Sequence, residues 1–304
     1  MTQTLSRAVV AGGTGLIGRR LVAELLRQGA AVAVLTRDPA GARVPEGAEA
    51  RSYGELGTAL EGADAVFNLA GASIAGRRWS KAYKRELLES RATTTARLVE
   101  AIGRCNQKPE VLVNASAIGW YGPHGIEPLD ETAQEGTSFL AELCREWEAA
   151  ADGAASMGLR VVKLRTGVVL AKEGGALPKM ALPVKLFQGA KLGQGDQGLS
   201  WIHIEDLVAM YVKAASDEGW SSAINATAPE PLSNAAFTKL LGKHLHRPIL
   251  PVPGFVTAAA LKLLVGELSG ELLTGAYVLP KRAEALGFAF RFKTADAALA
   301  DLIG

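Results

Sequence analysis

Three glycines near the start of the chain have the spacing of a phosphate-binding turn. They follow the apolar run 8–11 and precede a helical pattern over residues 19–29, as in a strand–turn–helix unit. In such a unit the glycines permit a tight turn, and the first helical N–H groups attract a diphosphate. A plain tight turn without a ligand is the alternative. The predicted diphosphate contacts are Gly12, Gly13, Thr14, Gly15, Leu16, Ile17 and Gly18.

The end of the second predicted strand, residues 29–35, indicates which dinucleotide would bind. An NAD site places Asp or Glu there to accept a hydrogen bond from the ribose 2′-hydroxyl. This strand is followed by Thr36 and Arg37, and a hydroxyl with a guanidinium suits a 2′-phosphate. The sequence therefore predicts NADP(H). Two alternatives stay open: Asp38 contacts a ribose, or Arg37 is an ordinary solvated arginine.

Strand and helix patterns alternate through the first half of the chain. Apolar strand patterns cover residues 65–71, 111–117 and 159–165, and helical patterns cover 83–103 and 138–157. Near-continuous apolar strands separated by helices are typical of a parallel sheet with helices on both faces. The predicted fold class is α/β, a Rossmann-type doubly wound parallel sheet, with its ligands beyond the carboxyl ends of the strands.

The pattern loosens after residue 170. Residues 172–198 are rich in Gly, Lys and Pro and show no clear period. We expect a dinucleotide-binding domain over residues 1–170, with strand and helix returns near 200–228. We expect a smaller, mainly helical part over residues 171–304 that packs over the open end of the sheet. A substrate would then lie between the two parts.

Composition excludes several classes of function. The chain has 304 residues and a formal net charge of +2, so nothing indicates nucleic acid or an anionic membrane as a partner. Cys105 and Cys144 lack a CxxC spacing, which argues against a disulfide framework or a metal site. No apolar run approaches the ~20 residues of a membrane span, and no signal-peptide pattern is present. We expect a cytoplasmic monomer or homodimer that acts on a small-molecule substrate.

Several motifs together resemble the short-chain dehydrogenase/reductase family, in its extended, epimerase-like form. Their order along the chain is more specific than any one of them alone. The resemblance implies a Rossmann fold and further cofactor contacts at Leu69, Ala70, Gly71 and Val169. The motifs are GGTGLIG at 12–18, NLAG at 68–71, SAIGWYG at 116–122, LRTGVVL at 164–170 and WIHIEDL at 201–207.

Three further segments narrow the resemblance to the atypical "epimerase family" subgroup, formerly labelled sugar-nucleotide epimerase-like or cell-division-inhibitor-like. They are residues 77–91, residues 143–148 and a carboxyl-terminal block over 251–303. The resemblance implies that Glu86 and Arg91 lie beside the cofactor. The alternative for Arg91 is a helix-surface arginine paired with Glu86 or Glu89.

The resemblance also shows that two catalytic residues of the family are absent from this chain. Family members use a Tyr and a Lys four residues later to move a proton, and the aligned positions here hold Leu140 and Cys144. Ser116 remains at a strand end, where it could bond a substrate carbonyl. Tyr121 is the first candidate for a replacement proton donor and Cys144 the second. The alternative for Tyr121 is a packed aromatic ring, and that for Cys144 is a small buried thiol. We expect His203 to brace loops, and the alternative is a role in acid–base chemistry.

Two functions remain open from the sequence. The first is an NADP(H)-dependent oxidoreductase or epimerase-like enzyme acting on a small polar, phosphorylated or nucleotide-linked molecule. The second is an NADP(H)-binding sensor or assembly factor without turnover, since the Tyr and Lys are absent. An open polar cavity reached by Tyr121 or Cys144 would favour the enzyme, whereas apolar side chains at that place would favour the sensor.

Overall fold

A seven-stranded parallel sheet forms the centre of the computed structural model, which describes residues 4–304. The strand order is β11-β7-β5-β4-β1-β2-β3, and every neighbouring pair is parallel. The chain therefore reverses its winding direction beside β1, and the predicted doubly wound α/β fold is confirmed. The strands are β1 (Arg7–Ala11), β2 (Ala31–Thr36), β3 (Glu49–Ser52), β4 (Ala65–Asn68), β5 (Val111–Ala117), β7 (Arg160–Thr166) and β11 (Ser222–Ala226).

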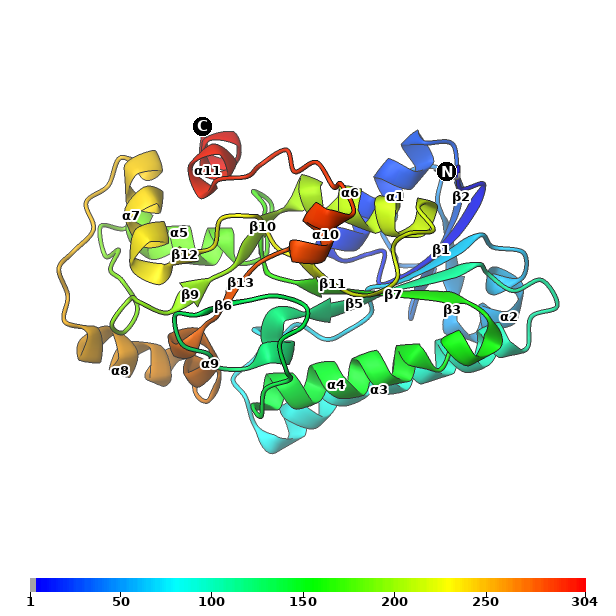
Figure 1. Cartoon of the computed structure of the whole chain (residues 1–304), viewed down its shortest axis with the longest axis horizontal. Coiled ribbons are helices and arrows are strands. Elements are labelled where there is room, and N and C mark those ends of the chain that lie inside the picture. Colours follow the sequence, from blue (N-terminus) through cyan, green and yellow to red (C-terminus); the bar gives the residue numbers. More distant parts are fainter. Residues whose placement is uncertain (1–3) are drawn as a thin grey trace.

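Helices cover both faces of this sheet (Figure 1). Successive strand residues face opposite sides, so Val10 and Val34 pack in one core cluster, and Val9 and Leu35 pack in another. The first cluster includes side chains of α1 and α6, and the second includes side chains of α2 and α3. The covering helices are α1 (Leu16–Arg27), α2 (Leu56–Leu60), α3 (Lys81–Gly103), α4 (Phe139–Asp152) and α6 (Ile204–Ser216).

The remaining elements gather mainly at one end of the molecule (Figure 1). Three two-stranded sheets join them: β8 (Val168–Leu170) with β10 (Trp201–His203), β9 (Gly198–Leu199) with β12 (Leu232–Ser233), and β6 (Pro128–Leu129) with β13 (Tyr277–Val278). A separate apolar core includes Trp201, Phe237 and Leu299. The helices are α5 (Leu177–Lys185), α7 (Asn234–Leu245), α8 (Gly254–Val265), α9 (Leu268–Thr274), α10 (Lys281–Ala285) and α11 (Ala295–Ile303).

Several boundaries predicted from the sequence are wrong. The strand predicted over 65–71 ends at Asn68, and the helix predicted over 19–29 covers Leu16–Arg27. The helix predicted over 138–157 ends at Asp152, and a separate 3-10 turn covers 155–157. The strand predicted from residue 29 begins at Ala31, because Gly29 has a positive φ of 91° and belongs to the turn after α1.

The segment predicted to lack a period, residues 172–198, contains α5. Pro178 lies in its first turn and Pro183 inside it, so prolines obscured the helical pattern. Within residues 4–304 no helix is both long and apolar enough to cross a membrane.

Candidate functional site

The glycine turn after β1 packs closely against the end of β4. A Cβ atom on Gly12 would lie 2.7 Å from the carbonyl carbon of Leu69, and Gly12 also has a positive φ of 82°. A Cβ atom on Gly18 would lie 2.2 Å from the Gly12 carbonyl oxygen. Since real Cβ atoms do not approach so closely, both positions need glycine. The turn thus lies beside Leu69 and Ala70, two of the residues predicted to contact a cofactor.

The start of α1 has room for an anion. Gly15 is the N-cap residue and has no side chain to accept a hydrogen bond from the first-turn N–H groups. Gly15 is exposed, and Thr14, Leu16 and Ile17 around it are partly exposed. The free N–H groups and the positive end of the helix dipole attract a negative group here.

The segment after β8 lies close to the start of α1. A Cβ atom on Gly175 would lie 3.2 Å from Leu16 Cδ2 and 3.4 Å from the carbonyl oxygen of Val169. The fold therefore brings Val169 close to the glycine turn, although more than 150 residues of chain separate them. Contact of Val169 and of the glycine turn with a cofactor stays a prediction.

The Asp38 side chain accepts a hydrogen bond within its own turn. Its Oδ1 accepts a hydrogen bond from the Gly41 N–H at 3.1 Å. The neighbouring Arg37 is exposed, and its side chain makes no hydrogen bond or ion pair within residues 4–304. Thr36, at the end of β2, is partly exposed. The Arg37 guanidinium is therefore available to a ligand, and the exposed Asp38 carboxylate keeps its second oxygen, Oδ2, free of hydrogen bonds in the described chain.

Arg91 is buried, and its predicted alternative of a helix-surface ion pair is wrong. Only 8% of the residue is exposed. Its guanidinium donates hydrogen bonds to the carbonyl oxygens of Leu87 at 3.1 Å and Ala72 at 2.9 Å, and lies 5.0 Å from the centre of the Trp147 ring. Gly71 makes room for it, because a Cβ there would lie 2.9 Å from the guanidinium carbon. The Arg91 side chain thus lies directly against the segment after β4, at Gly71 and Ala72.

The Arg91 charge has no carboxylate partner within the described chain. Its Nε is buried and makes no hydrogen bond there, and no ion pair to it exists among residues 4–304. Burial lowers its pKa, yet arginine stays charged in proteins. A buried unpaired charge is destabilising by several kcal/mol, roughly, so this position favours a bound anion. Glu86, also predicted to lie beside the cofactor, pairs with Arg77 at 3.2 Å, and its contact with a cofactor stays a prediction.

Ser116 belongs to a buried network at the end of β5. Its hydroxyl donates to Oε1 of Glu148 on α4 at 2.6 Å. The Arg165 side chain of β7 donates to both Glu148 oxygens, from Nε at 2.9 Å and from a terminal nitrogen at 3.0 Å. Glu148 is 2% exposed and Arg165 is 5% exposed. Such a bidentate pair fixes both side chains, and with them the separation of α4 from the sheet.

The Tyr121 hydroxyl joins the same network. It donates to Asn225 Oδ1 at 2.7 Å and accepts from an Arg165 nitrogen at 3.2 Å. The Arg165 guanidinium also stacks on Trp120, 3.9 Å from the ring centre. Tyr121 is 1% exposed, and burial raises its pKa. This geometry does not support the predicted proton-donor role, and it favours the alternative of a packed aromatic ring.

Cys144 is also enclosed. It is 1% exposed, and its thiol donates to the Ala117 carbonyl oxygen at 3.6 Å. Burial raises the pKa of the Cys144 thiol to about 12. These observations favour the alternative of a small buried thiol. Leu140, at the position of the family's tyrosine, is partly exposed and packs against Gly119.

His203 braces loops, as expected. Its Nδ1 accepts from the Glu205 N–H at 3.2 Å at the start of α6, and its ring stacks on Phe292 with 3.8 Å between centres. Its Nε2 lies 3.3 Å from Asp301 Oδ2. Within residues 4–304 no cluster of three or more His, Cys, Asp or Glu side chains is arranged to hold a metal ion.

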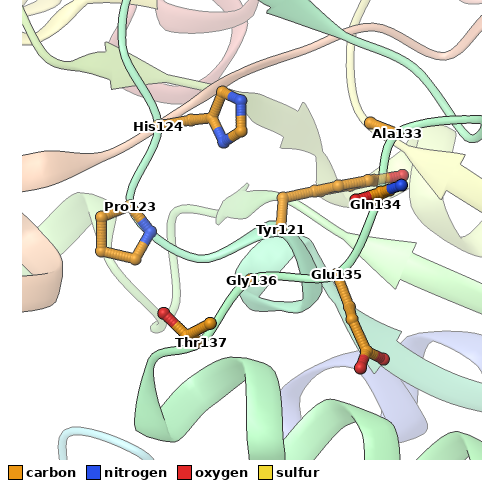
Figure 2. A pocket seen from close by; sticks show the side chains of 8 residues that line it. All are labelled: Tyr121, Pro123, His124, Ala133, Gln134, Glu135, Gly136 and Thr137. Carbon is orange, nitrogen blue, oxygen red and sulfur yellow. The ribbon is translucent and has the colours of Figure 1, made fainter.

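A cavity of about 490 Å³ opens beside Tyr121 (Figure 2). Its walls come from the segment after Tyr121 and from the segment that leads into α4. None of the lining residues belongs to the glycine turn, so this cavity is separate from the start of α1. The lining residues are Tyr121, Pro123, His124, Ala133, Gln134, Glu135, Gly136 and Thr137.

Comparison with known proteins agrees with this architecture. The model of the NAD dependent epimerase/dehydratase family matches residues 8–225. A second model, described as a domain of unknown function (DUF1731), matches residues 256–302. The chain belongs to the NAD dependent epimerase/dehydratase family, and the predicted resemblance to its "epimerase family" proteins is confirmed.

Similar proteins occur in distant organisms. The chain is 41% identical to the chloroplastic epimerase family protein SDR39U1 homolog of Arabidopsis thaliana, over 95% of this chain and 84% of that protein. A human epimerase family protein, SDR39U1 isoform 2, has been solved with NADPH; it is 32% identical, with a TM-score of 0.87 over 98% of this chain and 99% of that one. A structure described as a nucleoside-diphosphate sugar epimerase, from Corynebacterium glutamicum, is 34% identical, with a TM-score of 0.79 over 98% of this chain and 58% of that one.

The network around Glu148 gives a stability prediction. Glu148→Ala leaves the Arg165 charge buried and unpaired, so we expect a loss of about 3–5 kcal/mol in the free energy of unfolding. The double variant Glu148→Leu/Arg165→Met removes both charges and is expected to lose less than Glu148→Ala. Urea unfolding measures both. Glu86→Ala is the control, because the exposed pair with Arg77 contributes at most about 1 kcal/mol. A loss below that level for Glu148→Ala would contradict the buried pair.

Proposed function

We propose that this protein binds NADP(H) in a groove between the glycine turn, the end of β4 and the segment after β8. The observation that carries the proposal is the hydrogen bonding of the two charged side chains that follow β2. Arg37 is exposed without a partner in the described chain, while the Asp38 carboxylate is held by the Gly41 N–H. A free guanidinium directly after β2 favours a 2′-phosphate, whereas the carboxylate that could bind the ribose diol of NAD comes one residue later and already accepts a hydrogen bond within its own turn. The NADPH of the human relative supports this choice.

The residues present fit such a cofactor. The exposed Gly15 and the uncapped N–H groups of α1 would bind the diphosphate. The unpaired guanidinium of Arg91 would add positive charge at the end of β4, and Leu69 and Val169 would flank the groove. When bound, the dinucleotide supplies hydride-transfer chemistry. The protein's own part is to bind, to orient and to exclude water.

We propose further that the protein is an oxidoreductase or epimerase-like enzyme acting on a small polar substrate. The family and the sugar-nucleotide epimerase name of the Corynebacterium protein support this proposal. In it, residues 1–170 with the returns near 200–228 hold the cofactor, and residues 171–304 hold the substrate. Ser116, Tyr121 and Cys144 then act by positioning, since their polar atoms bond to Glu148, to Arg165 and Asn225, and to Ala117, respectively.

Binding without turnover is the second candidate. It is favoured by the partly exposed Leu140 at the place of the family's tyrosine, and by the enclosed Tyr121 hydroxyl and Cys144 thiol. A protein of this kind would respond to the level of NADP(H) and would not consume it. The two candidates share the cofactor site and differ only in whether hydride leaves the nicotinamide.

Selectivity for the cofactor tests the first proposal. Arg37→Asp places a carboxylate where the 2′-phosphate would lie, so NADPH affinity is expected to fall at least about a hundredfold. NADH affinity is expected to change less than about threefold, because NADH lacks that phosphate. Fluorescence titration measures both dissociation constants. Equal losses for the two coenzymes would refute the role of Arg37.

Arg91 gives a test with opposite effects on the free and bound protein. Arg91→Met removes an unpaired buried charge, so the ligand-free protein is expected to unfold at the same or a higher temperature. The stabilisation by saturating NADPH is expected to fall by about 1–3 kcal/mol. Thermal unfolding with and without NADPH measures both quantities. The control is Arg85→Met, since Arg85 is exposed on the same helix. An undiminished NADPH stabilisation in Arg91→Met would rule out an anion contact.

Turnover separates the two candidate functions. We expect NADPH absorbance to fall with at least one member of a panel of carbonyl compounds and nucleotide sugars. We expect Tyr121→Phe to retain that turnover within about tenfold, because a positioning hydroxyl contributes about 1 kcal/mol. Complete loss of turnover in a folded Tyr121→Phe variant would restore Tyr121 as the proton donor. No turnover with any substrate, despite tight NADPH binding, would favour the sensor.

A further inference from the structure

Helix α8 is apolar and yet exposed. Its only charged residue is Lys262, and none of its 12 residues is buried. Of the large apolar side chains in residues 4–304, the three most exposed lie on this helix: Phe255, Leu263 and Leu264, each 75% exposed. A helix that is apolar around its whole circumference is normally buried, and an exposed apolar patch of this kind marks an interaction surface.

The exposed residues of α8 form one continuous face. At 3.6 residues per turn, they lie in two adjacent rows with steps of four residues and cover about half of the helical circumference. The opposite half attaches α8 to the protein. The Thr257 hydroxyl accepts a hydrogen bond from the Gly193 N–H at 3.0 Å, and Val265 packs against the core cluster that includes side chains of α1 and α6. We call the exposed set the α8 face: Phe255, Val256, Ala259, Ala260, Leu263 and Leu264.

The order of side chains along the α8 face is symmetric. Two alanines lie in the middle, and a pair of large apolar residues lies at each end. If two copies cross antiparallel at the alanines, the Phe255–Val256 end of each copy meets the Leu263–Leu264 end of the other. A two-fold dimer needs such a self-complementary surface, and small residues at the axis let two helices approach to about 8 Å.

The charge of α8 favours a second copy of this chain over other partners. The α8 face contains no ionisable group, so it offers a charged partner nothing to pair with. A lipid surface is disfavoured, because an interfacial helix needs a polar face rich in Lys or Arg, and α8 has only Lys262. A second α8 face is uncharged as well, so no charge is buried unpaired when the two meet.

The size of the α8 face agrees with a weak dimer. Its six side chains expose on the order of 600 Å², which is the upper end of the apolar patches seen on monomers. Two copies would together bury roughly 1,200 Å², which is the lower limit of specific interfaces. An interface of this size favours a dimer that dissociates at about micromolar concentrations.

We propose that the α8 face is a homodimer interface in which two α8 helices cross antiparallel at Ala259 and Ala260. In this arrangement Val256 of one copy packs against Leu263 of the other, and Lys262 stays at the solvated rim. The interface contains no residue of the proposed cofactor site, so it can be tested without NADP(H).

The first experiment compares the wild-type chain, Leu263→Glu and the control Leu182→Glu. Leu182 is 57% exposed on α5, which lies apart from α8 (Figure 1). Sedimentation equilibrium from about 1 to 200 µM is expected to show a monomer–dimer equilibrium for the wild type and for Leu182→Glu. Leu263→Glu is expected to weaken dimerisation at least about thirtyfold, because each new carboxylate would lose its water against Val256 of the other copy.

A second variant tests the crossing point, and it does so even if Leu263→Glu fails to fold. Ala260→Cys places one thiol of each copy beside the two-fold axis, where the two Cα atoms can come within the about 4.4–6.8 Å that a disulfide needs. The native Cys105 and Cys144 are buried, so they do not compete. Mild oxidation is expected to link Ala260→Cys into covalent dimers and to leave Leu182→Cys unlinked.

Four results would overturn the proposal. A wild type that stays monomeric up to about 200 µM excludes the dimer. A dimer that Leu263→Glu leaves unchanged uses another surface, and a dimer that Ala260→Cys does not link lacks the antiparallel crossing. A monomer that floats with vesicles of phosphatidylcholine and phosphatidylserine, and loses this binding in Leu263→Glu, assigns the α8 face to a lipid surface instead.

Discussion

The close approach of the first turn to the ends of β1 and β4 is the constraint on which the rest of the site depends. No side chain fits at Gly12 or Gly18, so the backbone of the turn lies directly beside Leu69. This packing places the uncapped start of α1 at the carboxyl edge of the sheet. Strand order makes that edge the point where the winding direction reverses, and such a point leaves a crevice between neighbouring connections.

Positive charge without a protein partner is the second feature of this edge. Arg91 is buried without a carboxylate in the described chain, and Arg37 lies exposed without one. The buried, unpaired charge of Arg91 costs stability, which a bound polyanion would compensate. Arg37 is solvated, so its guanidinium can bind an anion without first leaving a protein partner. By contrast, the charges around Ser116 are fully paired, since Glu148 and Arg165 satisfy each other. Among the described residues, positive charge near β2 and β4 is therefore available to an anion. The charged side chains near β5 and β7 are instead bonded to each other.

Local patterns were enough to predict the parallel sheet and the glycine turn from the sequence. The turn motif, the strand before it and the helix after it are contiguous, so spacing alone identified them. The charged interior near Ser116 was not predictable in this way. Ser116 bonds to a residue 32 positions away, and Tyr121 bonds to one 104 positions away, so only the folded chain shows that they are engaged. The signals in the sequence were weak: a glutamate beside the apolar stripe of α4, and an arginine within the apolar strand β7.

Calorimetric titration of the wild-type protein with NADPH and with NADH tests the central claim most directly. The account predicts one equivalent of NADPH bound, with an affinity at least about tenfold above that of NADH, which corresponds to about 1.4 kcal/mol. Heat of binding for neither coenzyme, in a folded sample, would contradict the assignment of the groove beside the glycine turn.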